Sequence, residues 1–466
     1  MTNRILLLDL LVVTLLWGTG CGGSGHSVAS DPWEAAYLQT YAEKDGATRG
    51  RDSNPNRRHD LAPDAKSSLA HLISLAEERN PGLRAAYDRW TAAIAEIPQA
   101  ESLPDPQLSY TYFVEPVETR VGPQRQKFGL SQTVPLFGKR SLRGDLAAHN
   151  ANASGARFEA ARRELHLRVT QLWNDSYLLH QSIAITEENV QLLTHLERVA
   201  LRQYSSGAAP QSVVLRAQVE LGRLEERLRS LEDQKRPLRA ALNAELDRPV
   251  ETDIAWADSI DTRPLPLSIE DLRLLTLNGN PQLRAVSSLV AKEAAASDLA
   301  GKNSIPDVTL GAEIIDTGRA EIQGVKDSGK NAVVASVKVN LPLWRSRFGA
   351  ERSEAEAQHS AALHERLQLE NQLLAKLEWA HFELRDAERR AELYAHNLLP
   401  RGRQSLEVTE NAFITGQATF LDLVDAQRVL LEFQLAEKRA LTDRANWRAE
   451  LEQIVGVDLE SGETTP

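Results

Sequence analysis

The stretch FITGQATFLDLVDAQ, residues 413–427, determines the fold because a related stretch occurs earlier in the chain. The earlier stretch, YSSGAAPQSVVLRAQ at residues 204–218, shares its aromatic residue, its glycine, one alanine and a final Ala-Gln pair at a constant shift of 209 positions. In both, a run with helical periodicity ends at a glycine, Gly207 or Gly416, and a second such run soon follows. Glycine readily adopts the positive φ of a helix C-terminus, so we predict two helical hairpins with these stretches at their tips.

Composition favours long helices over a compact sandwich. The chain has 466 residues, of which 42% are hydrophobic, 26% charged and only 5% aromatic. Such a chain can bury a core, but it has few of the aromatic side chains that fill sandwich interiors. The formal net charge of −11 argues against a nucleic-acid partner.

The N-terminus has the pattern of an exported protein. An apolar run at residues 5–17 is too short to span a bilayer, and it predicts a signal peptide over residues 1–21. Cys21 ends this segment and resembles the acylated cysteine of a bacterial lipoprotein, so we expect a lipid anchor in the outer membrane. The alternative is an unmodified thiol, because Gly18 stands where that pattern usually has leucine. Residues 22–60, rich in polar residues and glycine, are predicted to be a flexible tether.

The chain is a tandem duplication. The motif NPGLRA at residues 80–85 recurs as NPQLRA at residues 280–285, a shift of 200. Two further anchors are Pro104-Asp105 with Pro306-Asp307, at a shift of 202, and Val134-Pro135-Leu136 with Leu341-Pro342-Leu343, at a shift of 207. A shift that grows only through small insertions indicates two copies of one unit of roughly 200 residues. The predicted organisation is a first repeat at 61–250, a linker at 251–268, a second repeat at 269–458 and a tail at 459–466.

Each repeat contains two stretches with a period of two. Alternation of apolar and mainly polar residues predicts strands near residues 107–114 and 128–134 in the first repeat, and near 308–314 and 333–339 in the second. The four strands each have one apolar face. The fold class predicted for the chain is therefore mainly α with a small β part.

The helices follow heptad spacing. From residue 138 to residue 204 the apolar positions are alternately four and three apart, as in a coiled coil. If this segment is continuous, its roughly 66 residues form a rod about 100 Å long at 1.5 Å per residue. Such a rod is far longer than a bilayer is thick.

Four strands cannot close a sheet by themselves. An open sheet with one apolar face would expose that face and both edges, so several chains must share it. Three copies would supply twelve strands, a plausible membrane barrel, whereas two would supply eight and leave the lumen filled by side chains. The alternative is an ordinary sheet packed against the helices.

These motifs together resemble the TolC-like outer-membrane efflux proteins, over residues 67–458. The resemblance rests on the duplicated Asn-Pro-x-Leu-Arg-Ala motif, on the strand-to-helix turns VPLFGKR at 134–140 and LPLW at 341–344, and above all on residues 413–427 after Leu398-Leu399-Pro400. It implies a homotrimer with a twelve-stranded outer-membrane β-barrel and an α-helical periplasmic tunnel. It also implies a periplasmic adaptor and an inner-membrane pump of the resistance-nodulation-division type as partners.

The segment ETRVGPQ at residues 118–124, with the turn that follows the next strand, is similar to members of heavy-metal export systems. The resemblance therefore implies export of metal ions or small toxic compounds through a passive duct. The alternative function is a lipid-anchored periplasmic coiled-coil scaffold without a channel. The four amphipathic strands favour the duct, since a scaffold has no use for them.

Enzymatic and metal-binding patterns are absent from the sequence. His359 and His364 are five residues apart and so do not share a helical face, and no His-Glu-x-x-His motif or cysteine pair occurs. No nucleophile constellation or phosphate-binding glycine loop is found either. We expect no resident metal, no cofactor and no enzymatic activity.

The hairpin tips are candidate docking sites for the adaptor. Small side chains there would let another helical hairpin approach closely. The candidate residues are Gly207, Ala208, Ala209, Gly416, Gln417, Ala418 and Thr419. The alternative is that the two glycines only terminate helices.

Asp422 and Asp425 are candidates for a gate. They are three residues apart, so both lie on one helical face, and their stretch resembles the aspartate ring at the periplasmic entrance of TolC-like channels. Three copies would bring six carboxylates together and favour cations. The first repeat has Val213 and Arg216 at the matching positions, and Arg216 could pair with an aspartate and hold the tip closed. The alternative is that the aspartates merely solvate the surface and complement the helix dipole.

Overall fold

The computed structural model describes residues 68–459. The signal peptide predicted at 1–21, the lipidation of Cys21 and the tether at 22–60 lie outside the described residues, as does most of the tail. The first described helix begins at Leu69, with the Ser68 side chain accepting a hydrogen bond from the amide of His71.

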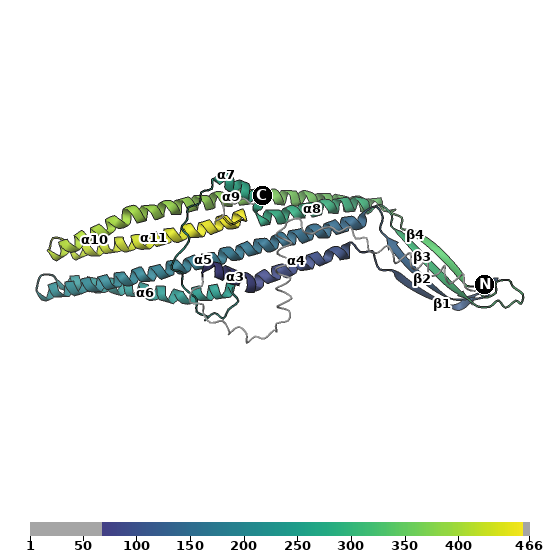
Figure 1. Ribbon diagram of the computed structural model, residues 1–466, viewed down its shortest axis with the longest axis horizontal. Coiled ribbons are helices and arrows are strands. Elements are labelled where there is room, and N and C mark those ends of the chain that lie inside the picture. The colour runs from purple at the N-terminus through teal and green to yellow at the C-terminus, as the bar shows by residue number, and fades with distance from the viewer. Residues whose placement is uncertain (1–67, 460–466) are drawn as a thin grey trace. The chain divides into compact units, whose positions relative to one another are not determined.

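The order of elements occurs twice (Figure 1). The first half contains α3 (Leu69–Arg79), α4 (Pro81–Ala100), β1 (Gln107–Val117), β2 (Gln124–Val134), α5 (Lys139–Ser205) and α6 (Gln211–Glu245). The second contains α7 (Ile269–Gly279), α8 (Pro281–Lys302), β3 (Val308–Thr317), β4 (Ala332–Val339), α9 (Arg345–Leu393), the π-helical turn η2 (Tyr394–Leu398), α10 (Leu399–Ile414) and α11 (Phe420–Val455). The predicted strands, the continuous helix after residue 138 and the tandem duplication are confirmed.

The chain divides into two compact units. The sheet unit contains residues 88–155 and 285–366, with all four strands. The helical unit contains, among the described residues, 68–87, 156–284 and 367–459, with both hairpin tips. No helix among the described residues is long and apolar enough to cross a membrane.

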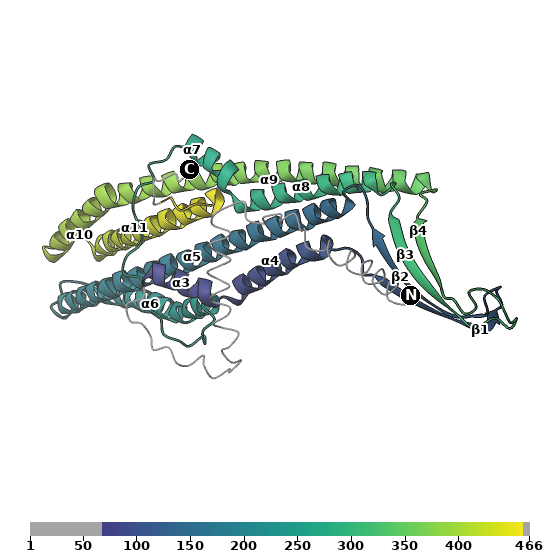
Figure 2. The same cartoon turned by 45° about the vertical axis from the view of Figure 1, so that its right-hand side comes forward.

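The four strands form one antiparallel sheet in the order β1-β2-β3-β4 (Figures 1 and 2). The register aligns apolar side chains in rows across it. One row contains Tyr110, Phe128, Ile314 and Val333, and the next contains Leu108, Leu130, Ala312 and Ala335. The larger side chains of both rows are exposed in the single chain. The sheet therefore presents an uncovered apolar face, as the period of two predicted.

The opposite face is mainly polar. Lys127 of β2 and Glu313 of β3 form an ion pair of 3.1 Å across the central seam. Nearer the helices, the Thr133 and Thr309 hydroxyls lie 2.8 Å apart and share a hydrogen bond. The seam between β2 and β3, which joins the two repeats, thus has polar side-chain contacts in addition to its backbone ladder.

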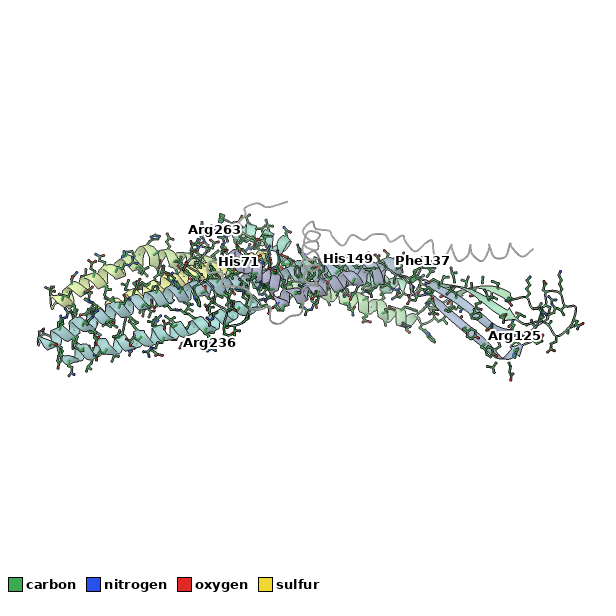
Figure 3. All side chains as sticks on the ribbon, turned by 60° about the horizontal axis from the view of Figure 1, so that its bottom comes forward. His71, Arg125, Phe137, His149, Arg236 and Arg263 are labelled. Carbon is green, nitrogen blue, oxygen red and sulfur yellow. The ribbon has the colours of Figure 1, made fainter. Side chains whose placement is uncertain are left out.

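The strand-to-helix turn after β2 is built around two consecutive residues with positive φ. Phe137 has φ 59° and Gly138 has φ 78°, and Figure 3 shows Phe137 at this turn. The turn buries Lys139, which is only 3% exposed. Its Nζ donates to the carbonyl of Ile305 at 2.6 Å and to Asp307 Oδ1 at 2.9 Å. The start of α5 is therefore fixed to the start of β3 in the other repeat.

The duplicated asparagines close each repeat within the helical unit. Asn80 Oδ1 accepts from the Leu83 amide at 3.0 Å, and Asn80 Nδ2 donates to the carbonyl of Glu245, the last residue of α6, at 3.1 Å. Asn280 repeats both contacts with Leu283 at 2.9 Å and with Ile454, near the end of α11, at 2.7 Å. Each asparagine thus caps one helix while satisfying a terminal carbonyl of another.

The long helices of the two repeats differ in one respect. Helix α5 is continuous over 67 residues, whereas its counterpart is interrupted by η2 before α10. Beyond the interruption, Gly402 allows close packing, because a Cβ there would lie 3.3 Å from the ring of Phe433 on α11. Tyr394 of η2 also contacts that ring, with centroids 6.0 Å apart.

We expect Asn280→Ala to lower the free energy of unfolding by about 1 to 3 kcal/mol, because it leaves the buried Ile454 carbonyl without a donor. Asn280→Asp keeps the acceptor for the Leu283 amide but removes the donor, so comparing the two variants separates the cap from the closure. Denaturant unfolding measures the free energy of unfolding of both variants. Asn411→Ala, at an exposed position, is the control. Equal stability of wild type and Asn280→Ala would show that the closure contributes nothing.

Candidate functional site

The two hairpin tips have the same backbone in the helical unit. Gly207 and Gly416 have φ of 77° and 76°. The amides that follow donate back to the last turn, from Ala208 to Gln203 at 2.8 Å and from Gln417 to Ala412 at 2.8 Å. Both glycines therefore terminate helices in the left-handed conformation predicted for them. A Cβ at either position would contact nothing within 4 Å, so both tips are open to the surroundings.

The side chains of the two tips differ. In the second tip, Phe413 and Phe420 are buried and their rings pack edge to face at 5.8 Å. The matching residues of the first tip are the exposed Tyr204 and the polar Gln211. Helix α6 begins after Pro210 without a side-chain cap. The second tip is thus the more tightly packed one.

Thr419 and Asp422 form a capping box at the start of α11. The Thr419 hydroxyl accepts from the Asp422 amide at 3.2 Å, and Asp422 Oδ2 accepts from the Thr419 amide at 2.9 Å and from its hydroxyl at 2.7 Å. These hydrogen bonds, the hydroxyl's first, lower the pKa of Asp422. Asp422 therefore complements the helix start, which was the alternative considered for it, while remaining fully exposed.

Asp425 belongs to a different set of contacts. Its carboxylate lies 3.7 Å from Arg428 on the same helix. Arg428 in turn reaches across to α6, where its Nη2 and Nε lie 2.5 and 3.3 Å from the two carboxylate oxygens of Glu220. Hydrogen bonding to Glu220 raises the pKa of Arg428. This fork joins the two hairpins just behind their tips.

Arg216 lies in a groove of about 220 Å³ between α6 and α11. The groove is lined by Leu215, Arg216, Val219, Glu220, Phe420, Leu421, Val424 and Arg428. Among the described residues Arg216 forms no ion pair, and the partner of Asp425 in the single chain is Arg428 instead. The structure therefore brings the gate candidates to the same end of the helical unit without joining Arg216 to either aspartate.

A buried amide pair holds the same region together. Gln427 Nε2 donates to Asn189 Oδ1 at 2.8 Å, and Asn189 Nδ2 is 3.2 Å from Gln434 Oε1. Both Asn189 and Gln427 are buried. The sequence marks Gln427 through its match with Gln218, but nothing in the sequence signals Asn189, Glu220 or Arg428 as contacts of the tips.

Metal ligation is not seen in residues 68–459, which contain no group of three or more His, Cys, Asp or Glu side chains able to hold an ion. Near the tips, Asp422 belongs to a capping box, and Asp425, Arg428 and Glu220 belong to ion pairs. Their arrangement suits positioning of helices and interaction with mobile ions rather than bond-making chemistry.

Comparison with known proteins identifies a family and a relative that this chain matches. The model of a family described as outer membrane efflux protein matches residues 72–246 and 272–457. The cobalt-zinc-cadmium resistance protein CzcC of Cupriavidus metallidurans is 23% identical over 398 residues, covering 84% of this chain and 90% of CzcC.

Two solved structures with the same fold are the outer membrane protein VceC of Vibrio cholerae and CusC. VceC is 19% identical with a TM-score of 0.71, covering 84% of this chain and 97% of VceC. CusC is 16% identical with a TM-score of 0.72, covering 87% of this chain and 95% of CusC.

We expect protonation of Asp422 to loosen the start of α11. Because the folded-state pKa is lowered, the cap contributes fully above the ordinary value of 3.8 and is lost as pH falls through the lowered pKa. Hydrogen exchange of the first-turn amides of α11, corrected for intrinsic rates, should show protection falling at acid pH in wild type. Asp422→Asn should have lower protection at neutral pH and lack this acid step. Asp425→Asn should keep the wild-type protection at neutral pH and the wild-type fall at acid pH. An unchanged acid profile in Asp422→Asn would contradict the capping role.

Proposed function

Because this chain belongs to the outer membrane efflux protein family, we propose that three copies form the passive exit duct of a tripartite efflux system. The chain is thus not an enzyme. In this proposal the sheets of three copies form a twelve-stranded barrel in the bacterial outer membrane, and the helical units form a tunnel in the periplasm. The predicted repeats, 61–250 and 269–458, would each supply one strand pair and one long hairpin.

The observation that carries the proposal is the uncovered apolar face of the sheet. The strands have 8 to 11 residues, close to the roughly 9 to 11 that cross a bilayer when tilted. Hydrocarbon can cover the exposed rows, but it cannot satisfy the backbone groups at the edges of β1 and β4. Further copies of the chain can satisfy them. A coiled-coil scaffold without a channel gives this face no role.

The proposed partners follow from the position of such a duct. A periplasmic adaptor would join the hairpin tips to an inner-membrane pump, for which we propose the resistance-nodulation-division type. CzcC is named for resistance to cobalt, zinc and cadmium, and this supports metal ions as cargo, with small toxic compounds as the second candidate. The lipid on Cys21, the signal peptide and the tether remain proposals from the sequence.

The contacts of the tips support a gate at the periplasmic end of the proposed duct. In three copies, Asp422 and Asp425 would form a ring of six carboxylates at the periplasmic end. Arg216 lacks an ion-pair partner among the described residues of one chain, so an aspartate of a neighbouring copy is available to it. Such exposed links are worth about 0.2 to 1 kcal/mol each, and a set of three would favour closure without making it permanent.

Single-channel recording on the purified oligomer in planar bilayers tests both the duct and the gate. Replacing both aspartates by alanine should weaken cation selectivity and block by multivalent cations, because the attracting charge is removed. Arg216→Ala should raise conductance, because a closing link is lost.

Thr419→Val is the matched control for these variants. It removes the hydroxyl from the capping box but leaves both carboxylates, so selectivity should stay at the wild-type value. A loss of selectivity in Thr419→Val equal to that of the double variant would assign the effect to the cap. Absence of any channel from wild-type oligomer would refute the duct.

Docking of the adaptor at the tips is proposed for both turns, at residues 207–209 and 416–419. The open space around the two glycines and the small side chains beside them leave room for another hairpin. The alternative of helix termination alone makes a different prediction for substitutions that fit the left-handed backbone.

We expect Gly416→Asn and Gly416→Val both to reduce adaptor cross-linking, because either adds bulk at the proposed contact. Asparagine tolerates positive φ, whereas valine does not, so only the valine variant should also destabilise the hairpin. Chemical cross-linking in cells and thermal unfolding of purified protein give the two readouts. If Gly416→Asn cross-links to the adaptor as strongly as the wild type does, helix termination is the only role of this glycine.

A further inference from the structure

The internal duplication specifies how one copy meets the next. We infer that β4 pairs with β1 of the partner subunit in the register in which β2 pairs with β3, so that Val337 lies opposite Tyr110 of the partner subunit. This inference rests on the proposed oligomer, and it fixes residue by residue a contact that a single chain does not contain.

The two strand pairs of the sheet are equivalent. The sequence anchors relate β1 to β3 by a shift of 202 and β2 to β4 by a shift of 207. These shifts carry Leu108 to Leu310 and Leu130 to Val337. In the sheet Leu108 lies opposite Leu130, and Leu310 lies opposite Val337. Backbone pairing therefore reproduces the equivalence that the sequence alone gives.

The seam between the repeats serves as a template for the seam between copies. Leu130 of β2 lies opposite Ala312 of β3. The equivalent of Leu130 is Val337, and the equivalent of Ala312 under the shift of 202 is Tyr110. The same seam built from the free edges of β4 and β1 therefore places Val337 beside Tyr110 of the partner subunit.

The neighbouring contacts follow from antiparallel pairing. With each β4 residue named first and the residue of the partner subunit second, the apolar face receives Val339 with Leu108 and Ala335 with Tyr112, and the other face receives Lys338 with Ser109 and Ser336 with Thr111. The rows of the apolar face thus continue from copy to copy. Register irregularities outside this segment limit the inference to it, since β1 is irregular beyond Tyr112 and β2 before Gln126.

The apolar pattern excludes some other registers but not all of them. A slip by one residue would bring Lys338 beside Tyr110 and reverse the faces of the whole strand. A slip by two residues would keep the faces, and only the duplication argues against it. An informative experiment must therefore separate registers two residues apart.

The seam between copies lacks the ion pair of its template. Inside the chain the ion pair of Lys127 and Glu313 crosses the seam at 3.1 Å. The equivalent positions are Val334 and Thr111, which carry no charge. The contact between copies therefore depends on backbone hydrogen bonds and the apolar rows.

Paired cysteines in the full chain test the register. The predicted pairs are Val337→Cys with Tyr110→Cys and Ser336→Cys with Thr111→Cys. Successive antiparallel pairs alternate between a wider and a closer spacing, so one of the two is a close pair. Within one chain β1 and β4 are the outer strands of the sheet, about 14 Å apart at roughly 4.8 Å per strand, so a disulfide can form only between copies.

The controls are pairs displaced by two residues on the same face, Val337→Cys with Leu108→Cys and Val337→Cys with Tyr112→Cys, together with each single variant. After mild oxidation of outer membranes, non-reducing gels should show dimers and covalent trimers for at least one predicted pair. Their yield should be at least ten-fold above every control, and reductant should remove them.

Two results would overturn the inference in distinguishable ways. Preferential cross-linking of a displaced pair, with wild type sedimenting as a trimer in mild detergent, would refute the register and leave the proposed function intact. Wild type sedimenting as a stable monomer in mild detergent would refute the proposed oligomer and, with it, the contact.

Discussion

Unpaired backbone groups at the edges of β1 and β4 are the constraint on which the rest of the structure depends. A four-stranded sheet that is apolar on one face cannot rest in hydrocarbon with free N–H and C=O groups, because each costs several kcal/mol there. The sheet order leaves those edges open, and the duplicated sequence supplies complementary edges at both ends. Within the sheet unit, the start of α5 is fixed to this sheet through the buried Lys139 and its contact with Asp307.

The two repeats share some contacts and differ in others. The shared contacts close each repeat, whereas the differing ones lie at the hairpin tips. Asn80 and Asn280 make the same two hydrogen bonds, so closure of each repeat is common to both halves. The tips have the same glycine turns but different side chains. Only the second has the buried aromatic pair and the capping box that starts at Thr419. The two tips thus share a backbone but differ in their side chains, so in the proposed docking and gate the two halves would not act identically.

Periodicity predicted the elements that depend on local sequence, and it could not predict contacts between distant helices. The alternation in β1 and the glycine at Gly416 are local signals, and both predictions are confirmed. The pairing of Arg428 with Glu220 joins residues 208 positions apart, and it depends on the register of two helices that heptads leave free. The turn η2 was also missed, because an extra residue in a helical turn leaves no residue type that signals it.

In the proposed gate, cation selectivity would depend on where the charges near the tips lie rather than on how many there are. The gate candidates and the residues of the Glu220 ion pairs comprise three acidic groups, Asp422, Asp425 and Glu220, and three basic groups, Arg216, Arg223 and Arg428. The formal charges of this set cancel within one copy, so three copies of the set have no net charge. Glu220 is paired with both Arg223 and Arg428, whereas Asp425 makes only a longer 3.7 Å contact with Arg428. The two aspartates and Arg216 are therefore the groups of this set best able to act on a passing ion. A ring of this composition attracts cations only if its carboxylates lie nearer the passage than Arg216 does, and removing Arg216 should therefore change both selectivity and conductance.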